Sequence, residues 1–420
     1  MRSLIHNLMN ANLAAFKPQA LRQSFHDWLY APVAEPSPAR EAQAMRWDKP
    51  LLFVSLALML LGVIMVYSAS IALPDSPKYA SYWGEHFFGR QLFFVVAGLI
   101  AGWFAFRVHI DKWQKWSWWF FVFAMVLLVL VLVPGIGKGV NGAHRWISLK
   151  VFNIQPSEIM KLAMVLFVAN FTVRNQQYMH RLTKGFFPVA FFLGIVGILL
   201  MMEPDMGALG VVVCIAMGIL FLGGFNRVWF AGMAGLLVSL FTMMIVFSPW
   251  RRARFFAYLD PWDEVNALGK GYQLSHSLIA FGRGGFTGVG LGGSVEKLHY
   301  LPEAHTDFIM AVVGEELGLV GVLVVICMFY WIVKRAFKIG RQCIAMDRMY
   351  SGLVAQGIGI WIGVQTFINM GVNLGLLPTK GLTLPLMSYG GSGIVLNCVA
   401  LAILLRIDYE NRKILRGGKC

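Results

Sequence analysis

Repeated apolar segments of membrane-spanning length constrain the fold of this chain more than any other feature. A spanning helix requires about 17–25 consecutive apolar residues, and the chain meets this requirement ten times. The composition agrees, since 58% of the 420 residues are hydrophobic and only 14% are charged. The expected fold class is therefore an all-α polytopic membrane protein with ten transmembrane helices. These fall near residues 51–70, 90–107, 115–134, 157–173, 186–202, 206–222, 227–248, 307–333, 351–372 and 385–405.

The distribution of Lys and Arg predicts the side of the membrane on which each loop lies. With the N-terminus inside, 23 of the 36 Lys and Arg residues fall on the cytoplasmic side and 12 outside, while Lys161 lies within a span. This positive-inside bias places both termini in the cytoplasm and the large loop 249–306, between the seventh and eighth spans, in the periplasm. The same bias explains the net charge of +15, so no nucleic-acid partner is expected.

The domain organisation follows from these spans. Residues 1–49 form a polar cytoplasmic tail without a signal peptide, residues 50–410 form the membrane domain, and residues 411–420 form a cytoplasmic C-terminal tail. The five cysteines are scattered and predict neither a disulfide framework nor a CxxC metal site.

Two groups of charged residues interrupt the apolar pattern. Glu158 and Lys161 are three residues apart at the start of the fourth span, so they share a helix face and can pair. Such a pair should face the protein interior or a wet cavity, either as a packing strut or as part of a path. The Glu203-Pro204-Asp205 turn is either a solvated outer hairpin or part of a site.

The stretch from Gly271 to Gly321 is the most polar and glycine-rich part of the outer region. A helix is expected near 271–281, and the glycine-rich GRGGFTGVGLGG lacks the GxxxxGK[ST] of a nucleotide-binding loop. Thr306 is a plausible N-cap that leaves Asp307 in the first helical turn. An ionised Asp307 facing an outer cavity could accept a proton from a sugar hydroxyl, although it could also only complement the helix dipole. Glu315 and Glu316, further along, are expected to be structural or paired with a cation.

Two further outer loops carry cations among flexible residues. The glycine-rich loop 134–156 contains Lys138 and Arg145, which suits an anionic head group. The loop before the last span contains Lys380, followed by the Ser388-Tyr389-Gly390-Gly391 segment. A broken helix end beside Lys380 could form part of a pocket.

Several long motifs in this order resemble the SEDS family of bacterial cell-wall polymerases. They are NGAHRWI, QPSEIMKLA, EPDMG, GYQLSHSLIAFGRGG, YLPEAHTDFIMAVVGEELGLVG and LLPTKGLTLPLMSYGGSG, and together they extend over roughly residues 50–410. The last motif is more similar to the cell-division branch of the family than to its elongation branch. Small departures are Gly393, where a second Ser is common, and His299 at a variable position.

The resemblance implies a peptidoglycan glycosyltransferase that polymerises lipid II at the division septum, on the periplasmic face of the inner membrane. It implies a class B penicillin-binding transpeptidase and other divisome membrane proteins as partners. The family's essential loop aspartate falls on Asp307, its acidic–basic pair on Glu158 and Lys161, and its loop arginine on Arg145.

Asp307 is then expected to be the general base, with undecaprenyl pyrophosphate as the leaving group. Arg145, Lys138, Lys380 or Arg252, with a magnesium or manganese ion as a further candidate, would hold the pyrophosphate. Ser388 belongs to the expected substrate-binding set. Two alternatives remain open: a lipid II flippase, disfavoured by the lack of clear internal repeats, and a divisome scaffold without chemistry.

Overall fold

The computed structural model describes residues 47–75, 85–140, 143–148, 153–179 and 181–417. The predicted N-terminal tail therefore lies almost entirely outside the described residues. Each of the ten predicted spans overlaps a helix, although residues 385–390 of the tenth precede its helix. The ten helices are α4 (Lys49–Ser70), α5 (His86–Arg107), α6 (Ile110–Leu132), α7 (Pro156–Arg174), α8 (Phe187–Met202), α9 (Met206–Leu222), α10 (Arg227–Val246), α14 (Ile309–Ala345), α15 (Met349–Asn373) and α16 (Gly391–Leu415).

Nine helical segments in the described part of the chain are long and apolar enough to cross a membrane, and α9, with 17 residues, is a shorter apolar helix. The remaining α-helices of the described chain are short and lie between α10 and α14. They are α11 (Pro249–Leu259), α12 (Glu264–Ala267) and α13 (Tyr272–Gly284), the last of which confirms the helix expected near 271–281. The final helix continues to Leu415, beyond the predicted boundary at residue 410.

The outer loop after α6 contains β-structure that the all-α prediction did not include. Strands β1 (Gly137–Val140), β2 (Ala143–Ser148) and β3 (Asn153–Ile154) form an antiparallel sheet in the order β1-β2-β3. In this sheet Lys138 pairs with Trp146, and the register shifts after Lys138. The sheet fixes a loop that, from its glycine content, was expected to be flexible, because hydrogen bonds between strands are invisible to a search for apolar runs.

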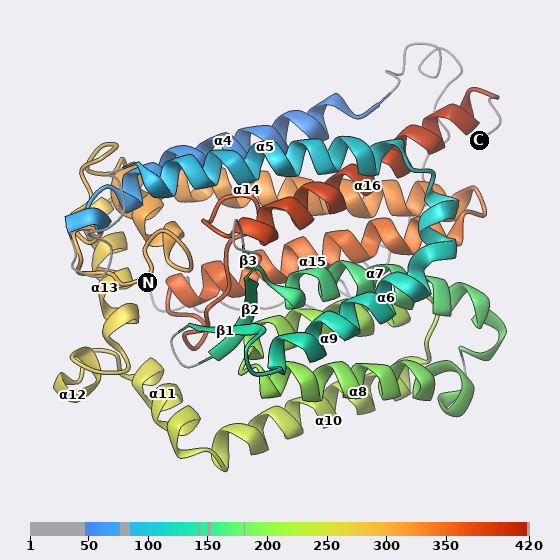
Figure 1. The fold of residues 1–420 in the computed structure, drawn as a ribbon, viewed down its shortest axis with the longest axis horizontal. Helices are drawn as coiled ribbons and strands as arrows, with labels where there is room; N and C mark the ends of the chain where they lie inside the picture. The colour runs from blue at the N-terminus through green and yellow to red at the C-terminus, as the bar shows by residue number, and fades with distance from the viewer. Residues whose placement is uncertain (1–46, 76–84, 141–142, 149–152, 180, 418–420) are drawn as a thin grey trace, which may run out of the picture.

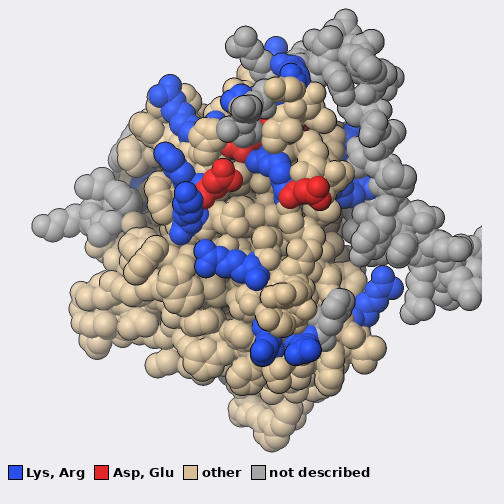
Figure 2. Space-filling view, turned by 90° about the vertical axis from the view of Figure 1, so that its right-hand side faces the viewer, with Lys and Arg blue, Asp and Glu red and all other residues tan. Residues whose placement is uncertain are grey.

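The long helices lie side by side, and the two ends of the bundle differ (Figure 1). The strands and α11–α13 lie at one end, and the described ends of the chain, near residues 47 and 417, lie at the other. Figure 2 shows this second end, where Lys and Arg side chains far outnumber Asp and Glu. This is the pattern expected of a cytoplasmic face.

Helix α7 is the centre of the bundle. It packs against α6, α9 and α15, and all but three of its 19 residues are buried. Its mean hydropathy of 1.3 is matched by α15 and is below that of the other candidate spans. The two least apolar spans are thus screened from lipid by more apolar neighbours, as their polar groups require. By contrast, α10 has no buried residue.

Candidate active site

Asp307 lies in a tight turn immediately before α14, not in the first turn of that helix. Helix α14 begins at Ile309, and Thr306 does not cap it; its hydroxyl instead donates to the main-chain and side-chain oxygens of Glu303. Glu303 has a left-handed φ of 59°, and its carbonyl accepts hydrogen bonds from the N–H groups of Thr306, Asp307 and Phe308. The N-cap prediction for Thr306 was therefore wrong, because the carbonyl of Glu303 gathers these donors.

The main chain and the carboxylate of Asp307 have different surroundings. Its carbonyl accepts hydrogen bonds from the side-chain amides of Asn369 (2.8 Å) and Asn373 (2.9 Å), both buried on α15. Its carboxylate is partly buried, accepts no hydrogen bond from the described residues, and lies against Gly381. A Cβ atom added to Gly381 would come within 2.9 Å of Oδ2 of Asp307. The carboxylate is thus held in place without being neutralised by a bonded partner.

Cations from three separate segments come together in the same outer region, and among them Arg145 is the one that lowers the pKa of Asp307. Lys380 follows α15, Arg251 and Arg254 lie on α11, and Arg145 lies on β2. The ammonium of Lys380 lies 5.8 Å from the ring centroid of Phe241 on α10, within cation–π range. Burial, followed by repulsion from Arg254, Arg251 and Arg145, lowers the pKa of Lys380 to about 8. A group of like charges held together in this way is favourable for a bound anion.

Arg145 is anchored through main-chain carbonyls. Its Nε donates to the carbonyl oxygen of Glu203 at 3.2 Å, and its Nη2 donates to that of Pro204. These bonds fix β2 to the turn between α8 and α9. They also leave the carboxylate of Glu203 without a hydrogen-bond partner among the described residues, although its side chain is completely buried.

The site contains two carboxyl groups with raised pKa values. Burial raises the pKa of Asp307 to about 7; Glu303 adds to this rise and Arg145 opposes it. Burial and the neighbouring Asp205 raise the pKa of Glu203 to about 8, again against the influence of Arg145. Asp307 is therefore close to its titration point at neutral pH, whereas Glu203 is mostly neutral.

Asp205 organises the outer ends of three helices. Its Oδ2 accepts hydrogen bonds from Ser157 at 3.0 Å and Gln155 at 3.2 Å, and its Oδ1 caps α9 by accepting from the N–H of Ala208. The main chain of Gln155 donates to Ser392 on α16. Glu203 and Asp205 are both buried, so the interpretation of their turn as solvated was wrong.

The predicted pair in α7 forms. Lys161 donates to Glu158 at 2.7 Å and to Gln365 on α15 at 2.7 Å, and both charged side chains are buried. Gln365 in turn donates to the carbonyl of Thr383 at 2.9 Å. Through Gln365 the pair is thus connected to Thr383, in the loop that carries Lys380. Oε2 of Glu158 is buried and has no hydrogen-bond partner within the described chain.

With this geometry established, comparisons with known proteins identify the family. A family model described as cell cycle protein, which spans FtsW, RodA and SpoVE, matches residues 49–413. The chain belongs to this family, the SEDS proteins. A curated relative from Burkholderia thailandensis, named "Probable peptidoglycan glycosyltransferase FtsW", is 63% identical over 90% of this chain and 82% of its own length. A protein of the same name from Thiomonas intermedia is 57% identical over 91% of this chain and 93% of its own length.

Solved SEDS structures share the fold. A chain from a structure titled "Structural coordination of polymerization and crosslinking by a peptidoglycan synthase complex" superposes with a TM-score of 0.68 and 26% identity, covering 87% of this chain and 98% of that chain. The rod shape determining protein RodA of Thermus thermophilus superposes with a TM-score of 0.62 and 25% identity, covering 87% and 97%.

Three residues expected in the SEDS site lie apart from the cluster around Asp307. Lys138 on β1 and Arg252 on α11 are exposed, and neither contributes to the lowered pKa of Lys380. Ser388 is buried, and its hydroxyl accepts a hydrogen bond from the N–H of Leu384 at 2.8 Å, so it stabilises a turn. On α11 the residues that approach Lys380 are Arg251 and Arg254, because the helix turns Arg252 towards solvent.

The sequence reasoning missed several residues of the site, namely Arg251, Arg254, Asn369 and Asn373. The two asparagines had a usable signal. They are four residues apart in an apolar helix, where an amide requires a partner inside the protein. Arg251 and Arg254 had no comparable signal, because their position depends on the packing of α11.

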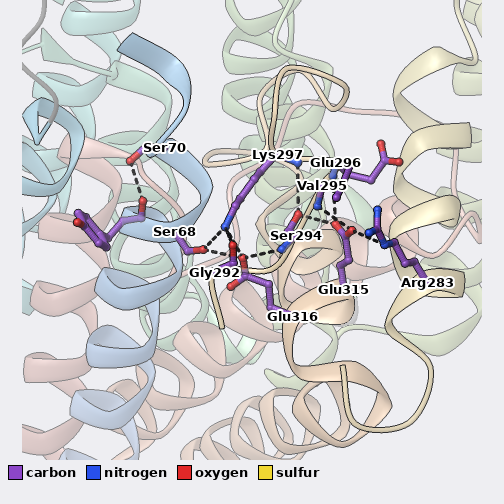
Figure 3. A network of polar contacts seen from close by, with 11 residues as sticks. Ser68, Ser70, Arg283, Gly292, Ser294, Val295, Glu296, Lys297, Glu315 and Glu316 are labelled. Carbon is purple, nitrogen blue, oxygen red and sulfur yellow. Dashed lines mark hydrogen bonds and ion pairs between the residues drawn. The ribbon is translucent and has the colours of Figure 1, made fainter. Parts of the chain in front are cut away.

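A separate network fixes the remainder of the outer loop to the bundle (Figure 3). Glu316 on α14 accepts hydrogen bonds from Ser68 on α4 at 2.6 Å and from Lys297 at 2.8 Å. Glu315 accepts from Ser294 at 2.5 Å and lies 3.7 Å from Arg283 of α13. The expectation that both glutamates are structural or paired with cations is confirmed. The network fixes the segment that leads to Asp307.

Proposed function

We infer that the chain is a peptidoglycan glycosyltransferase that polymerises lipid II, with Asp307 as its general base. The observation that carries this proposal is the Asp307 carboxylate. It is partly buried, accepts no hydrogen bond from the described residues, and has a pKa of about 7 under the influence of Arg145, which also acts on Lys380. A general base is most effective when its pKa lies near the working pH. The names of the curated relatives support the same activity.

The proposed reaction is a displacement at a sugar carbon. The 4-hydroxyl of the acceptor sugar attacks C1 of the donor's muramyl sugar while Asp307 accepts the hydroxyl proton. The bond between C1 and the phosphate oxygen breaks, undecaprenyl pyrophosphate leaves with the bonding electrons, and the configuration at C1 inverts. The main contribution of the protein is to position the hydroxyl and to stabilise the charge that develops on the leaving group.

The cations that gather around Lys380 suit the leaving pyrophosphate. We propose that Arg145, Lys380, Arg251 and Arg254 bind it, with the two α11 arginines in the role first assigned to Arg252. Arginine can donate two parallel hydrogen bonds to a phosphate, whereas lysine acts as a point charge. The lowered pKa of Lys380 reflects first the burial of its charge and then repulsion by the neighbouring arginines. A bound pyrophosphate would offset this repulsion.

We propose a magnesium or manganese ion only as one that would bind together with the substrate. The described residues bring no three His, Cys, Asp or Glu side chains together in a way that could hold a metal ion. A divalent cation at this site would therefore have to take most of its oxygen ligands from the phosphates of the substrate.

The wider setting is also proposed. It comprises ten spans with α9 as the tenth, both termini in the cytoplasm, loop 249–306 in the periplasm, and a location in the inner membrane at the division septum. The basic end of the bundle in Figure 2 supports this orientation. The similarity to a chain of the solved peptidoglycan synthase complex supports a class B penicillin-binding transpeptidase as partner. Contacts with other divisome proteins are expected from the resemblance.

The decisive experiment is polymerisation of purified lipid II by the protein with its partner transpeptidase. The wild type should produce glycan chains, and Asp307→Asn, folded and partner-bound, should produce none. Asp263→Asn, a change of an exposed aspartate in the same loop, is the matched control and should retain the wild-type rate. The rate should rise with pH, with a midpoint near 7, as Asp307 ionises.

Other results would change the assignment. Equal yields from the wild type and Asp307→Asn would exclude this residue as the base. Absence of chains from every variant, with partner and divalent cation present, would favour the flippase or scaffold hypothesis.

A further inference from the structure

Helix α15 carries two asparagines that contact the main chain of Asp307. Asn369 and Asn373 are four residues apart and therefore lie on one face of the helix. Both are at most 1% exposed. Each donates its side-chain amide to the same oxygen, the carbonyl of Asp307.

The second bond of each amide distinguishes the two residues. Nδ2 of Asn369 also donates to the carbonyl of Leu382, at 2.6 Å, two residues after Lys380. Nδ2 of Asn373 instead donates to the carbonyl of Asn369 at 2.9 Å, and its Oδ1 accepts from the N–H of Ala311 on α14 at 3.2 Å. Asn373 thus connects Asp307 to α14, whereas Asn369 connects Asp307 to the Lys380 loop.

The bridge formed by Asn369 joins two segments that are distant in sequence. An amide NH₂ group has two donors, and Asn369 places one on each segment. Without Asn369 the buried carbonyl of Leu382 would lose this donor, which costs free energy, whereas the carbonyl of Asp307 would keep its bond from Asn373. The bridge therefore constrains the separation between the main chain of Asp307 and the loop that carries Lys380. In that loop Gly381 lies so near the Asp307 carboxylate that an added Cβ atom would come within 2.9 Å of its Oδ2.

We propose that Asn369 is a positioning residue that sets the geometry between Asp307 and Lys380. This inference rests on the proposed function, in which Asp307 accepts the proton and Lys380 binds the pyrophosphate. Catalysis by positioned groups is sensitive to displacements of about 1 Å, which can cost about 100-fold in rate. Asn369 itself does not need to touch the substrate.

The test is a double-mutant cycle on the polymerisation rate, measured with the partner transpeptidase present. Asn369→Leu should lower kcat at least 10-fold, with the KM for lipid II changed less than threefold. Lys380→Gln should lower the rate on its own. In the double variant the combined loss should be well below the product of the two single losses, because the bridge has no effect once Lys380 is absent.

Two comparisons separate positioning from a loss of structure. Asn373→Leu combined with Lys380→Gln should show losses that multiply, because Asn373 does not contact the Lys380 loop. Asn397→Leu, which changes a buried asparagine on α16 that makes no hydrogen bond to these segments in the described chain, should leave kcat unchanged. Asn369→Ser, with a side chain too short to reach both carbonyls, serves if the leucine variant does not fold.

The outcomes are distinct. A wild-type kcat for the Asn369 variants, or losses that multiply with Lys380→Gln, would overturn the inference and leave the proposed function intact, provided that Asp307→Asn is inactive. Full activity of Asp307→Asn in the same assay would overturn the proposed function, and the role of Asn369 with it.

Discussion

Glu203→Gln should stabilise the protein, and the gain should depend on pH. Glu203 is completely buried, neither of its carboxylate oxygens has a hydrogen-bond partner in the described chain, and Asp205 lies nearby. Burial raises its pKa to about 8 from an ordinary value of 4.5. Glutamine has the same shape and no charge to desolvate, so it removes the cost of keeping a proton on a buried glutamate.

The magnitude follows from the two pKa values. Between pH 4.5 and 8 the unfolded chain releases this proton while the folded protein retains it, so the free energy of unfolding falls as the pH rises. At pH 7 the penalty is about 3 kcal/mol, and at pH 5 it is below about 1 kcal/mol. Glu203→Gln should therefore be about 2–3 kcal/mol more stable than the wild type at pH 7 and nearly equal at pH 5.

Unfolding in mixed detergent micelles, followed by fluorescence of the 14 tryptophans, measures this difference at both pH values. Glu264→Gln, which removes an exposed carboxylate from α12, is the control and should have little effect at either pH. A gain that is equal at pH 5 and pH 7, or a loss of stability at pH 7, would refute the reasoning. Either result would mean that the folded protein holds Glu203 in its ionised form.

Three further changes test other parts of the structure. Gly381→Ala should abolish polymerisation while leaving the fold intact, because its methyl group would displace the carboxylate of Asp307; the measurement is the lipid II assay together with size-exclusion chromatography. Gly393→Ser should raise the unfolding free energy by about 1–2 kcal/mol, since its hydroxyl would lie near the unpartnered Oε2 of Glu158; no gain would mean that another group already satisfies this oxygen. Lys297→Met should destabilise the protein by about 3–5 kcal/mol in the same unfolding assay, because it leaves a buried carboxylate without its cation, and a neutral result would show that the network in Figure 3 is not a stabilising ion pair.

The sequence predicted well those features that depend on residues close together in the chain. The ten helical segments follow from local hydropathy, and the pair of Glu158 and Lys161 follows from its spacing of three. Asp307, Arg145 and Lys380 were selected as candidates and lie in one region of the structure. The resemblance to the SEDS family contributed to that choice, and the family model confirms the resemblance.

Other features depend on contacts between distant segments and could not be derived in this way. The choice between Arg252 and its neighbours depends on which face α11 turns towards Lys380, and no helix was predicted at residues 249–259. The capping role of Thr306 failed because the left-handed backbone at Glu303 collects the competing hydrogen bonds. The neutral state expected of Glu203 follows from its burial in the folded protein and from the neighbouring Asp205, against the influence of Arg145.

The buried pair in α7 has a consequence for the synthesis of the protein. Lys161 needs Gln365 as its second partner, but α15 is about 190 residues further along the chain. At roughly 5–20 residues per second, α15 leaves the ribosome about 10–40 s after α7. An unpaired lysine at the centre of a helix opposes membrane insertion by about 3 kcal/mol.

Glu158 removes much of this difficulty because it belongs to the same helix turn and can neutralise Lys161 as soon as α7 forms. The ion pair can therefore keep the charge of Lys161 compensated while α7 inserts into the membrane, before the helices that will enclose it have been made. Once α15 arrives, the same lysine becomes the point at which the late helix joins the early one.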